Sequence, residues 1–410
     1  MSEVFEDEQH VALRTWVRRF AEERVRPQVA RMERSRTIER ELADEIAAQG
    51  WIGVTIPPSY GGMGLGHLAK TIVIEELARV SGAMGAMAQA SQLGVAKILH
   101  FGSKAQKQQW LPPISEGVCL PTIAVTEPGS GGHVLGMQST AVPDGRDYVL
   151  NGTKVFIGNS HVGHLHGVVV RTGPGSRGLS AFLVEADRPG VRLEPHADTL
   201  GLHGFSFGTV VFEDCRVPAA NRLGEEGLGL HVAYSSSTLY GRPNLAAVAL
   251  GIHRAVVEAT VAFCAERQQY GKPLSALPSI ALKLGEMQSR LMTARLTLYH
   301  ATHLLDRGLP CDAELMNAKL INTEYAIDSA RSAMEIFAAR GLHAEHQVER
   351  YLRDAYHIYA PAGTSDIQRL RLAEFASGSD RGQWSVRLAN LARLDVTAVA
   401  PNGTVGTEAA

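Results

Sequence analysis

Tyr148-Val-Leu-Asn-Gly-Thr-Lys-Val-Phe-Ile157 stands out from a chain that is otherwise mostly helical in pattern. Its β-branched and aromatic residues are typical of strands, and an Asn-Gly pair between two such runs is a strong signal for a β-hairpin. We therefore expect a hairpin whose turn lies at Asn151 and Gly152. Further strand-like runs follow at residues 167–171, 179–184 and 209–213. Several antiparallel strands within about 100 residues predict a small β-barrel or sandwich.

Helical patterns flank this region on both sides. Near the N-terminus, Leu13, Trp16, Val17 and Phe20 recur at helical spacing, and a loop rich in proline and glycine follows at residues 57–66. After about residue 228, long segments rich in Ala, Leu, Glu and Arg are broken at residues 271–273, 308–310 and 341. The sequence thus predicts an α+β fold with an N-terminal helical domain (1–118), a middle β domain (119–227), a C-terminal helical bundle (228–378) and a loosely ordered tail (379–410).

The composition is that of an ordinary soluble protein. The 410 residues are 45% hydrophobic with a formal net charge of −2, which gives no basic surface for nucleic acid or for an anionic membrane. We find no apolar run near the ~18 residues of a membrane span, and the acidic N-terminus lacks a signal-peptide pattern. Four cysteines without metal or disulfide spacing indicate reduced thiols. We therefore expect a cytoplasmic protein that binds neither nucleic acid nor membrane.

Gly173-Pro-Gly-Ser-Arg-Gly178 has the spacing of a dinucleotide-binding loop. That motif works only where it opens a helix whose N-terminus holds a pyrophosphate, and here a strand-like run follows instead. We therefore expect a plain turn.

Two groups of histidines suggest metal sites. His161, His164 and His166 lie close together, and His343 and His346 flank Glu345. No further carboxylate or cysteine completes either set at a typical metal-ligand spacing. We expect surface or packing roles for these histidines, and no metal.

Five segments resemble motifs of the flavin-dependent acyl-CoA dehydrogenase family, in the order and spacing that the family shows. They are Ile56-Pro-Pro-Ser-Tyr-Gly-Gly-Met-Gly-Leu-Gly66, Phe101-Gly-Ser-Lys-Ala-Gln-Lys-Gln-Gln-Trp-Leu-Pro112, Ala124-Val-Thr-Glu-Pro-Gly-Ser-Gly131, Glu266-Arg-Gln-Gln-Tyr-Gly-Lys272 and Tyr359-Ala-Pro-Ala-Gly-Thr-Ser-Asp-Ile-Gln-Arg369. The resemblance extends to about residue 376. It implies the family's fold (an N-terminal all-α domain, a middle β domain and a C-terminal four-helix bundle) and FAD as the cofactor.

The resemblance also implies which residues hold FAD. Those expected beside the isoalloxazine ring are Val125, Thr126, Gly131, Gly132, Phe156, Ile157 and Gly158. Arg267 and Tyr270 match positions that reach FAD bound largely by the neighbouring subunit, and a guanidinium can hold a pyrophosphate with two hydrogen bonds. Thr364 and Asp366 match contacts to the adenosine-diphosphate half. A site shared between subunits implies a homodimer or a homotetramer.

Several expected family contacts are changed in this chain. The replacements are Gly132-His133 for a Ser-Asp pair, Gly158 for a residue whose hydroxyl often reaches flavin N5, His203-Gly-Phe-Ser-Phe207 for Arg-x-Ser-Asp-Thr, Pro278 for Gln, and Phe337-Ala338-Ala339 for Phe-Gly-Gly.

The change of greatest consequence is Ala362, which stands where the family carries the glutamate that removes the substrate α-proton. Some members place this glutamate instead at the position of Gly241, so neither position supplies a carboxylate here. Tyr240 and Asp366 are candidates for a relocated base, although a tyrosine with its ordinary pKa of about 10 is a poor base. The backbone N–H of residue 362, which helps polarise the thioester carbonyl in the family, is retained because alanine has one.

Three functions remain open from the sequence. The first is FAD-dependent α,β-dehydrogenation of an acyl thioester, bound to coenzyme A or a carrier protein, with a relocated base and with an electron-transfer flavoprotein or oxygen as acceptor. The second is a flavin-dependent monooxygenase or oxidase of specialised metabolism. The third is a degenerate subunit that pairs with an active homologue.

Overall fold

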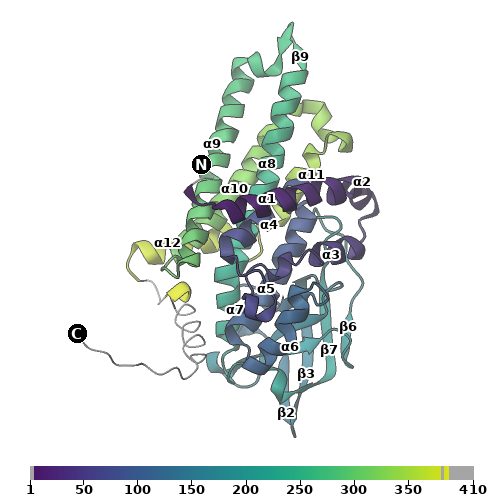
Figure 1. Ribbon diagram of the computed structural model, residues 1–410, viewed down its shortest axis with the longest axis vertical. Helices are drawn as coiled ribbons and strands as arrows, with labels where there is room; N and C mark the ends of the chain where they lie inside the picture. Colours follow the sequence, from purple (N-terminus) through teal and green to yellow (C-terminus); the bar gives the residue numbers. More distant parts are fainter. Residues whose placement is uncertain (1–3, 380–382, 387–410) are drawn as a thin grey trace, which may run out of the picture.

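The computed structural model describes residues 4–379 and 383–386, and Figure 1 shows helices over most of the molecule with the main group of strands at its lower end. The N-terminal elements are α1 (Glu8–Phe20), a π-helical turn (Ala21–Val25), α2 (Arg26–Ser35), α3 (Arg40–Ala47), α4 (Gly66–Val80), α5 (Gly82–Phe101) and α6 (Lys104–Ser115). The helix predicted near the N-terminus is confirmed, with Leu13 and Val17 on its buried face and an Asp7–His10 capping box at its start. α5 is buried almost throughout because it packs against α4, α8 and strand β1.

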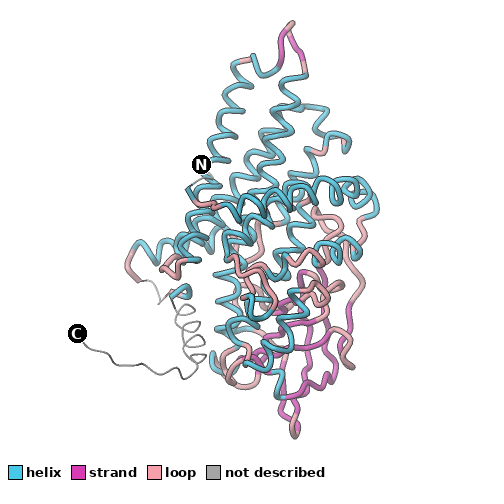
Figure 2. The backbone as a smooth tube through the Cα atoms, viewed as in Figure 1, coloured by secondary structure: helices cyan, strands magenta, loops and turns pink. Residues whose placement is uncertain are grey.

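The middle region is an eight-stranded sheet. Its strands are β1 (Pro121–Ala124), β2 (Thr140–Asp144), β3 (Asp147–Gly158), β4 (Leu165–Arg171), β5 (Leu179–Glu185), β6 (Val191–Leu193), β7 (Phe207–Pro218) and β8 (Arg222–Leu223). The order is β6-β7-β3-β2-β4-β5-β8, with β1 beside β4. Figure 2 shows these strands gathered at one end of the molecule. The runs at 167–171, 179–184 and 209–213 are confirmed as strands, but β4 is parallel to both β1 and β2, so the sheet is not wholly antiparallel.

The hairpin predicted at Asn151 and Gly152 is wrong. Both residues lie inside the continuous strand β3, and the turn that joins β2 to β3 lies at residues 145–146, between the paired Asp144 and Asp147. Gly152 sits at an irregularity in the β3–β7 register, and a Cβ there would lie 2.1 Å from the Ser139 Oγ atom. Glycine is needed here for a close approach of two segments, which is its other common use inside a strand.

The motif at residues 173–178 forms the turn between β4 and β5, as predicted. A Cβ at Gly178 would lie 1.9 Å from the carbonyl oxygen of Gly173. The glycines therefore serve to close the turn.

The C-terminal region begins with one continuous helical stretch. Its elements are α7 (Gly229–Ser236), a π-helical turn (Ser237–Gly241), α8 (Arg242–Glu266), β9 (Gln268–Gln269), β10 (Lys272–Pro273), α9 (Pro278–Asp306), α10 (Asp312–Phe337), two 3-10 segments (Ala338–Leu342 and Ala344–His346), α11 (Val348–His357) and α12 (Ser365–Ala376). The predicted breaks at 271–273, 308–310 and 341 all fall between long helices. In Figure 1, α8 and α9 run away from the sheet to a hairpin at β9.

The stretch from α7 through α8 also corrects an expectation about membranes. Residues Gly229–Glu266 are long and apolar enough to cross a bilayer, with an 18-residue window of mean hydropathy 1.5. However, 78% of that window is buried inside the protein, which is how the core helix of a bundle behaves.

The described part of the C-terminal tail is anchored. The Asp312 carboxylate, at the start of α10, accepts hydrogen bonds from the backbone N–H groups of Trp384 and Ser385 at 2.8 and 3.0 Å. The Trp384 ring packs near those of His231 and Tyr234. Residues 383–386 thus depart from the predicted loose tail, and residues 380–382 and 387–410 lie outside the described residues.

Candidate active site

Ala362 lies in a tight turn between α11 and α12 that two side chains hold in place. The Gln368 side chain donates to the carbonyl oxygens of Ala362 and Gly363 at 3.0 and 3.1 Å. The Lys319 ammonium donates to those of Tyr359 and Gly363 at 2.6 and 2.8 Å. Ala362 itself has a φ of 55°, which is unusual for a residue other than glycine. Within the described residues its own N–H has no acceptor in the protein.

The two positions that the resemblance assigns to a catalytic glutamate face each other. A Cβ placed on Gly241 would lie 3.3 Å from the Ala362 methyl carbon and 3.6 Å from a methyl carbon of Leu93. A single carboxylate at either position would therefore reach the same space. The structure brings together Ala362 and Gly241, 121 residues apart, exactly where neither carries a functional group.

Arg242, the residue after Gly241, is a buried cation at this place. Its Nε–H donates to the Gln368 amide oxygen at 2.9 Å, and a second N–H contacts the Thr238 hydroxyl. Burial lowers the pKa of Arg242 to about 10, and the charge of Asp312 opposes that effect. In the part of the chain that the structure describes, no carboxylate lies within 4 Å of its guanidinium.

Neither candidate for a relocated base has suitable surroundings. Burial raises the pKa of Tyr240 well above its ordinary value, so its phenol stays protonated, and its ring lies among the side chains of His67, His100 and Lys70. Asp366 has a side chain that is 87% exposed and pairs with Arg369. These surroundings do not favour Tyr240 or Asp366 as the catalytic base.

The segment that follows β1 is held by a buried ion pair. The Glu127 carboxylate accepts from the Lys154 ammonium at 2.7 Å and from the backbone N–H groups of Gln138 and Ser139. Lys154 also donates to the carbonyl oxygen of Val125, and the carbonyl oxygen of Thr126 accepts from a β3 N–H. These bonds use backbone carbonyls and leave the Thr126 side chain available.

After Glu127 the loop is open. A Cβ on Gly129, Gly131 or Gly132 would meet no heavy atom within 4 Å. A flat ligand could therefore approach this backbone closely.

Aromatic rings line the end of β3. Phe156, which is 66% exposed and has a φ of 60°, stacks on Phe207 with ring centroids 5.8 Å apart, and Phe207 stacks on Phe205. Ile157 is buried and points to the opposite side of the strand. A Cβ on Gly158 would lie 2.9 Å from Ala90 and 3.1 Å from the Phe205 ring. Phe205 thus occupies the space beside Gly158.

Arg267 and Tyr270 lie far from these residues, near the β9 hairpin at the other end of the molecule (Figure 1). Tyr270 is 82% exposed with a φ of 53°. Arg267 is exposed, and its guanidinium makes no bond within the described chain. The two groups of residues therefore lie at opposite ends of the subunit (Figure 1).

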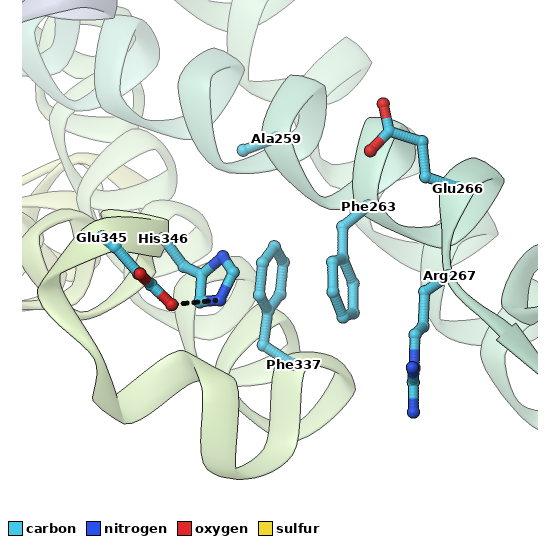
Figure 3. A pocket seen from close by; sticks show the side chains of 7 residues that line it. All are labelled: Ala259, Phe263, Glu266, Arg267, Phe337, Glu345 and His346. Carbon is cyan, nitrogen blue, oxygen red and sulfur yellow. Dashed lines mark ion pairs between the residues drawn. The ribbon is translucent and has the colours of Figure 1, made fainter.

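A cavity of about 430 Å³ lies beside Arg267 (Figure 3). Its lining residues are Ala259, Phe263, Glu266, Arg267, Phe337, Glu345 and His346. Phe263 and Phe337 stack with centroids 3.9 Å apart, and His346 pairs with Glu345 at 3.3 Å. Stacked rings next to a free guanidinium suit a planar heterocycle that is linked to phosphate.

Three further residues that the resemblance singles out lie at helix ends. Ala338 adopts φ 51° and ψ −132°, a conformation that normally requires glycine. Pro278 is the first residue of α9, where proline is well tolerated. Thr364 caps α12 by accepting from the Ile367 N–H at 3.5 Å.

The histidines at 161–166 each have protein partners. His161 bonds to the Glu194 carbonyl oxygen, His164 accepts from the Leu120 N–H, and His166 pairs with the Thr122 hydroxyl. No cluster of three metal-binding side chains occurs among the described residues.

Sequence reasoning missed four features of the site. It did not assign roles to Lys319, Gln368, the Glu127–Lys154 pair or the filling of space by Phe205. Of these four features, only the role of Gln368 could have been suspected from the sequence, because this residue belongs to the motif at residues 359–369. The others depend on contacts between segments that are far apart in the chain.

Three family models match successive parts of the chain. They are the acyl-CoA dehydrogenase N-terminal domain (residues 7–118), middle domain (122–215) and C-terminal domain (227–377). An acyl-CoA dehydrogenase of Bacillus subtilis is 34% identical over 374 residues, which cover 90% of this chain and 98% of the relative.

Solved structures agree with these matches. The prolyl acyl carrier protein oxidase AnaB has a TM-score of 0.86 at 28% identity, covering 90% of this chain and 99% of AnaB. The FAD complex of PigA has a TM-score of 0.86 at 28% identity, covering 91% of this chain and 98% of PigA. The chain belongs to the acyl-CoA dehydrogenase family of flavin-dependent oxidoreductases.

Proposed function

We propose that this protein binds FAD and oxidises an acyl thioester between its α and β carbons, without a side-chain base at either of the family's two positions. The observation that carries the proposal is the Ala362 turn. Its N–H is free of protein acceptors and borders the space between Ala362 and Gly241, while Gln368 and Lys319 fix its carbonyls. Such a donor suits a thioester oxygen that gains negative charge during the reaction.

The residues present fit FAD. The open loop at Gly131 and Gly132 and the exposed Phe156 ring offer a flat surface at one end of a subunit. Arg267 and the aromatic cavity at the other end offer a phosphate and adenine site to a neighbouring subunit. When bound, FAD would supply the acceptor for the β-hydride. A homodimer or homotetramer would bring the two ends together.

The chain's own residues would then do three things. The Ala362 N–H would hold the thioester oxygen and make the α-proton more acidic. Phe205, filling the space beside Gly158, would limit water next to the flavin. With no side-chain base in place, the α-proton would pass to a water molecule, and loss of a positioned base typically slows such a step by about 10²–10⁴-fold.

The thioester could be carried by coenzyme A or by a carrier protein. The B. subtilis relative is an acyl-CoA dehydrogenase, and AnaB acts on a prolyl carrier protein. The acceptor of the electrons would be an electron-transfer flavoprotein or oxygen.

A second candidate is a flavin-dependent monooxygenase on this fold, since such an enzyme needs no base at residue 362. The observation in its favour is that neither base position carries a functional group, while the loop at Gly131 and Gly132 is open and the Phe156 ring is exposed.

The test uses the purified full-length protein after incubation with FAD. Its visible spectrum is recorded, and butyryl-pantetheine and prolyl carrier protein are then added without oxygen. Slow bleaching of the flavin supports dehydrogenation. A flavin that is not bleached but consumes oxygen once reduced chemically supports the monooxygenase, and failure to retain any FAD would refute both.

A further inference from the structure

The C-terminal segment, residues 383–386, lies beyond residue 377, where the match to the family's C-terminal domain ends. It is nevertheless attached to two helices of that domain, and its Ser385 is only 3% exposed. The two helices are α7, which continues through a π-helical turn to Gly241, and α10, which carries Lys319. Both helices therefore lead to the Ala362 turn.

Four hydrogen bonds join the C-terminal segment to the start of α10. The backbone N–H of Cys311 donates to the Ser385 hydroxyl at 3.1 Å. The backbone N–H of Asp312 donates to the Gln383 amide oxygen at 3.4 Å. In return, the Asp312 carboxylate accepts from the backbone N–H groups of Trp384 and Ser385. Cys311 is the N-cap residue of α10 and its own side chain makes no capping bond, so the C-terminal segment supplies acceptors that the start of this helix needs.

The Trp384 ring joins the C-terminal segment to α7. It lies edge-on to the His231 ring with centroids 5.3 Å apart, and it is nearly parallel to the Tyr234 ring at 6.4 Å. His231 and Tyr234 are three residues apart, so they are neighbours on one face of the helix. Because the helical stretch is continuous from α7 into α8, a shift of α7 would be carried to Gly241.

α7 and α10 support the Ala362 turn from two sides. Lys319 lies about two helical turns after Asp312, and its ammonium holds carbonyl oxygens on both sides of Ala362. From the other side, a Cβ on Gly241 would lie 3.3 Å from the Ala362 methyl carbon. The Asp312 carboxylate also acts through its charge on Arg242, the residue after Gly241. The C-terminal segment thus contacts both supports of the turn.

We propose that the C-terminal segment links α7 to α10 and thereby positions the Ala362 turn, with Trp384 as the positioning residue. The link keeps the Ala362 N–H where a thioester oxygen can accept a hydrogen bond from it, and this catalytic consequence rests on the proposed function. The effect on the rigidity of the turn does not, because it can be measured without turnover.

Amide hydrogen exchange, followed by mass spectrometry on the full-length protein after incubation with FAD, measures how firmly each segment is held. We expect Trp384→Ala to speed exchange about tenfold in peptides that span residues 229–241 and 359–368, because an aromatic contact is lost and these segments open more often. Exchange in β4 should not change. If residues 359–368 exchange as in the wild-type protein, or if β4 speeds up equally, the C-terminal segment does not position the turn and the proposal fails.

Two variants serve as controls. Trp384→Phe keeps an aromatic ring against α7 and should restore slow exchange at least in part. Trp16→Ala removes another partly exposed tryptophan, which packs edge-on to Trp51 at 5.2 Å, and should leave the same two peptides unchanged. If either control loosens both peptides as much as Trp384→Ala does, the link does not run through the Trp384 ring, and the proposal is wrong.

Flavin reduction separates positioning from simple support. In Trp384→Ala, the rate at saturating butyryl-pantetheine should fall about tenfold or more, because a displaced donor no longer meets the thioester oxygen. The dissociation constant of butyryl-pantetheine should stay within about twofold. An unchanged rate despite looser peptides would mean that the C-terminal segment only supports the fold, which overturns the positioning role. If the wild-type flavin is not reduced at all, the proposed function fails, and hydrogen exchange still decides whether the C-terminal segment holds the turn.

Discussion

Arg254 and Arg242 both lie on α8 and are both buried, but their surroundings are opposite. Arg254 donates to the carboxylates of Glu75 and Glu76 at 2.8 Å each. The same two glutamates also pair with Arg14 and Arg295, and the Tyr299 hydroxyl donates to Glu75 at 2.5 Å. Arg242 donates only to the neutral Gln368 and Thr238 side chains, with Asp312 acting on it from farther away. The difference shows that one helix buries a guanidinium in two ways, either among carboxylates or among neutral acceptors.

The largest effect on stability is expected at Glu75, which pairs with Arg254. Burial alone would raise the pKa of Glu75, but Arg254 and Arg14 hold it well below its ordinary value. Glu75→Gln would leave several guanidinium groups short of a partner and should lower the free energy of unfolding by about 3–5 kcal/mol. Urea denaturation at fixed protein concentration measures this. Glu258→Gln, which removes a half-exposed partner of Arg79, should cost at most about 1 kcal/mol. If Glu75→Gln and Glu258→Gln lower the free energy of unfolding equally, the fully buried carboxylate is no more important for stability than the half-exposed one.

A buried lysine can also become neutral by releasing a proton, and Lys70 allows this to be tested. Burial lowers the pKa of Lys70 to about 7, below the ~10.4 of an unfolded lysine. Between these values the unfolded chain binds more protons, so this group makes the free energy of unfolding rise with pH. Relative to Lys70→Met, the wild-type protein should gain about 1.4 kcal/mol per pH unit between about pH 7.5 and 9. Denaturation at several pH values measures the difference.

The exposed Lys283 supplies the control for this experiment. Lys283→Met should leave the pH dependence of the wild-type protein unchanged. Parallel curves for the wild-type protein and Lys70→Met would mean that Lys70 stays charged when folded.

Gly158 and Phe205 show a substitution that the structure does compensate, in contrast to Ala362. Gly158→Ala places a methyl group 2.9 Å from Ala90 and 3.1 Å from the Phe205 ring. It should destabilise the protein by about 1–3 kcal/mol through overpacking. In a double-mutant cycle, Phe205→Leu should recover part of this cost. Simple additivity of the two changes would show that the Phe205 ring does not fill the space beside Gly158.

The smallest effect is expected on the rate of flavin reduction when Tyr240 is replaced. Because burial raises the pKa of its phenol well above the ordinary value, Tyr240→Phe should change the rate of flavin reduction by a thioester less than about tenfold, well short of the loss of a general base. Stopped-flow absorbance measures the rate. A fall of 100-fold or more would restore Tyr240 as the base.

Much of the fold was predictable because local patterns set it. The buried face of α1, the strands β4, β5 and β7, and the breaks between long helices follow from periodicity and from proline and glycine. The hairpin predicted at Asn151 is wrong because Gly152 accommodates the close approach of Ser139, which lies just before β2, and no local pattern reveals that contact.

The candidate site was predictable only in part. The resemblance identified Ala362 and Gly241 as alternative base positions, and the structure places them together. The burial of Arg242 and Lys319 next to the Ala362 turn could not be foreseen, because it depends on which segments surround each side chain after folding. The FAD contacts at Val125, Thr126, Arg267, Tyr270, Thr364 and Asp366 stay predictions.

The account's central claim is that the site lacks a side-chain base at both Ala362 and Gly241. The most direct measurement is the rate of anaerobic flavin reduction by butyryl-pantetheine in Ala362→Glu, with Ala362→Gln and the wild-type protein as controls. We predict that Ala362→Glu is about 10²–10⁴-fold faster than both, the usual contribution of a general base. If the wild-type protein reduces its flavin as fast as Ala362→Glu, a base already exists elsewhere and the claim is contradicted.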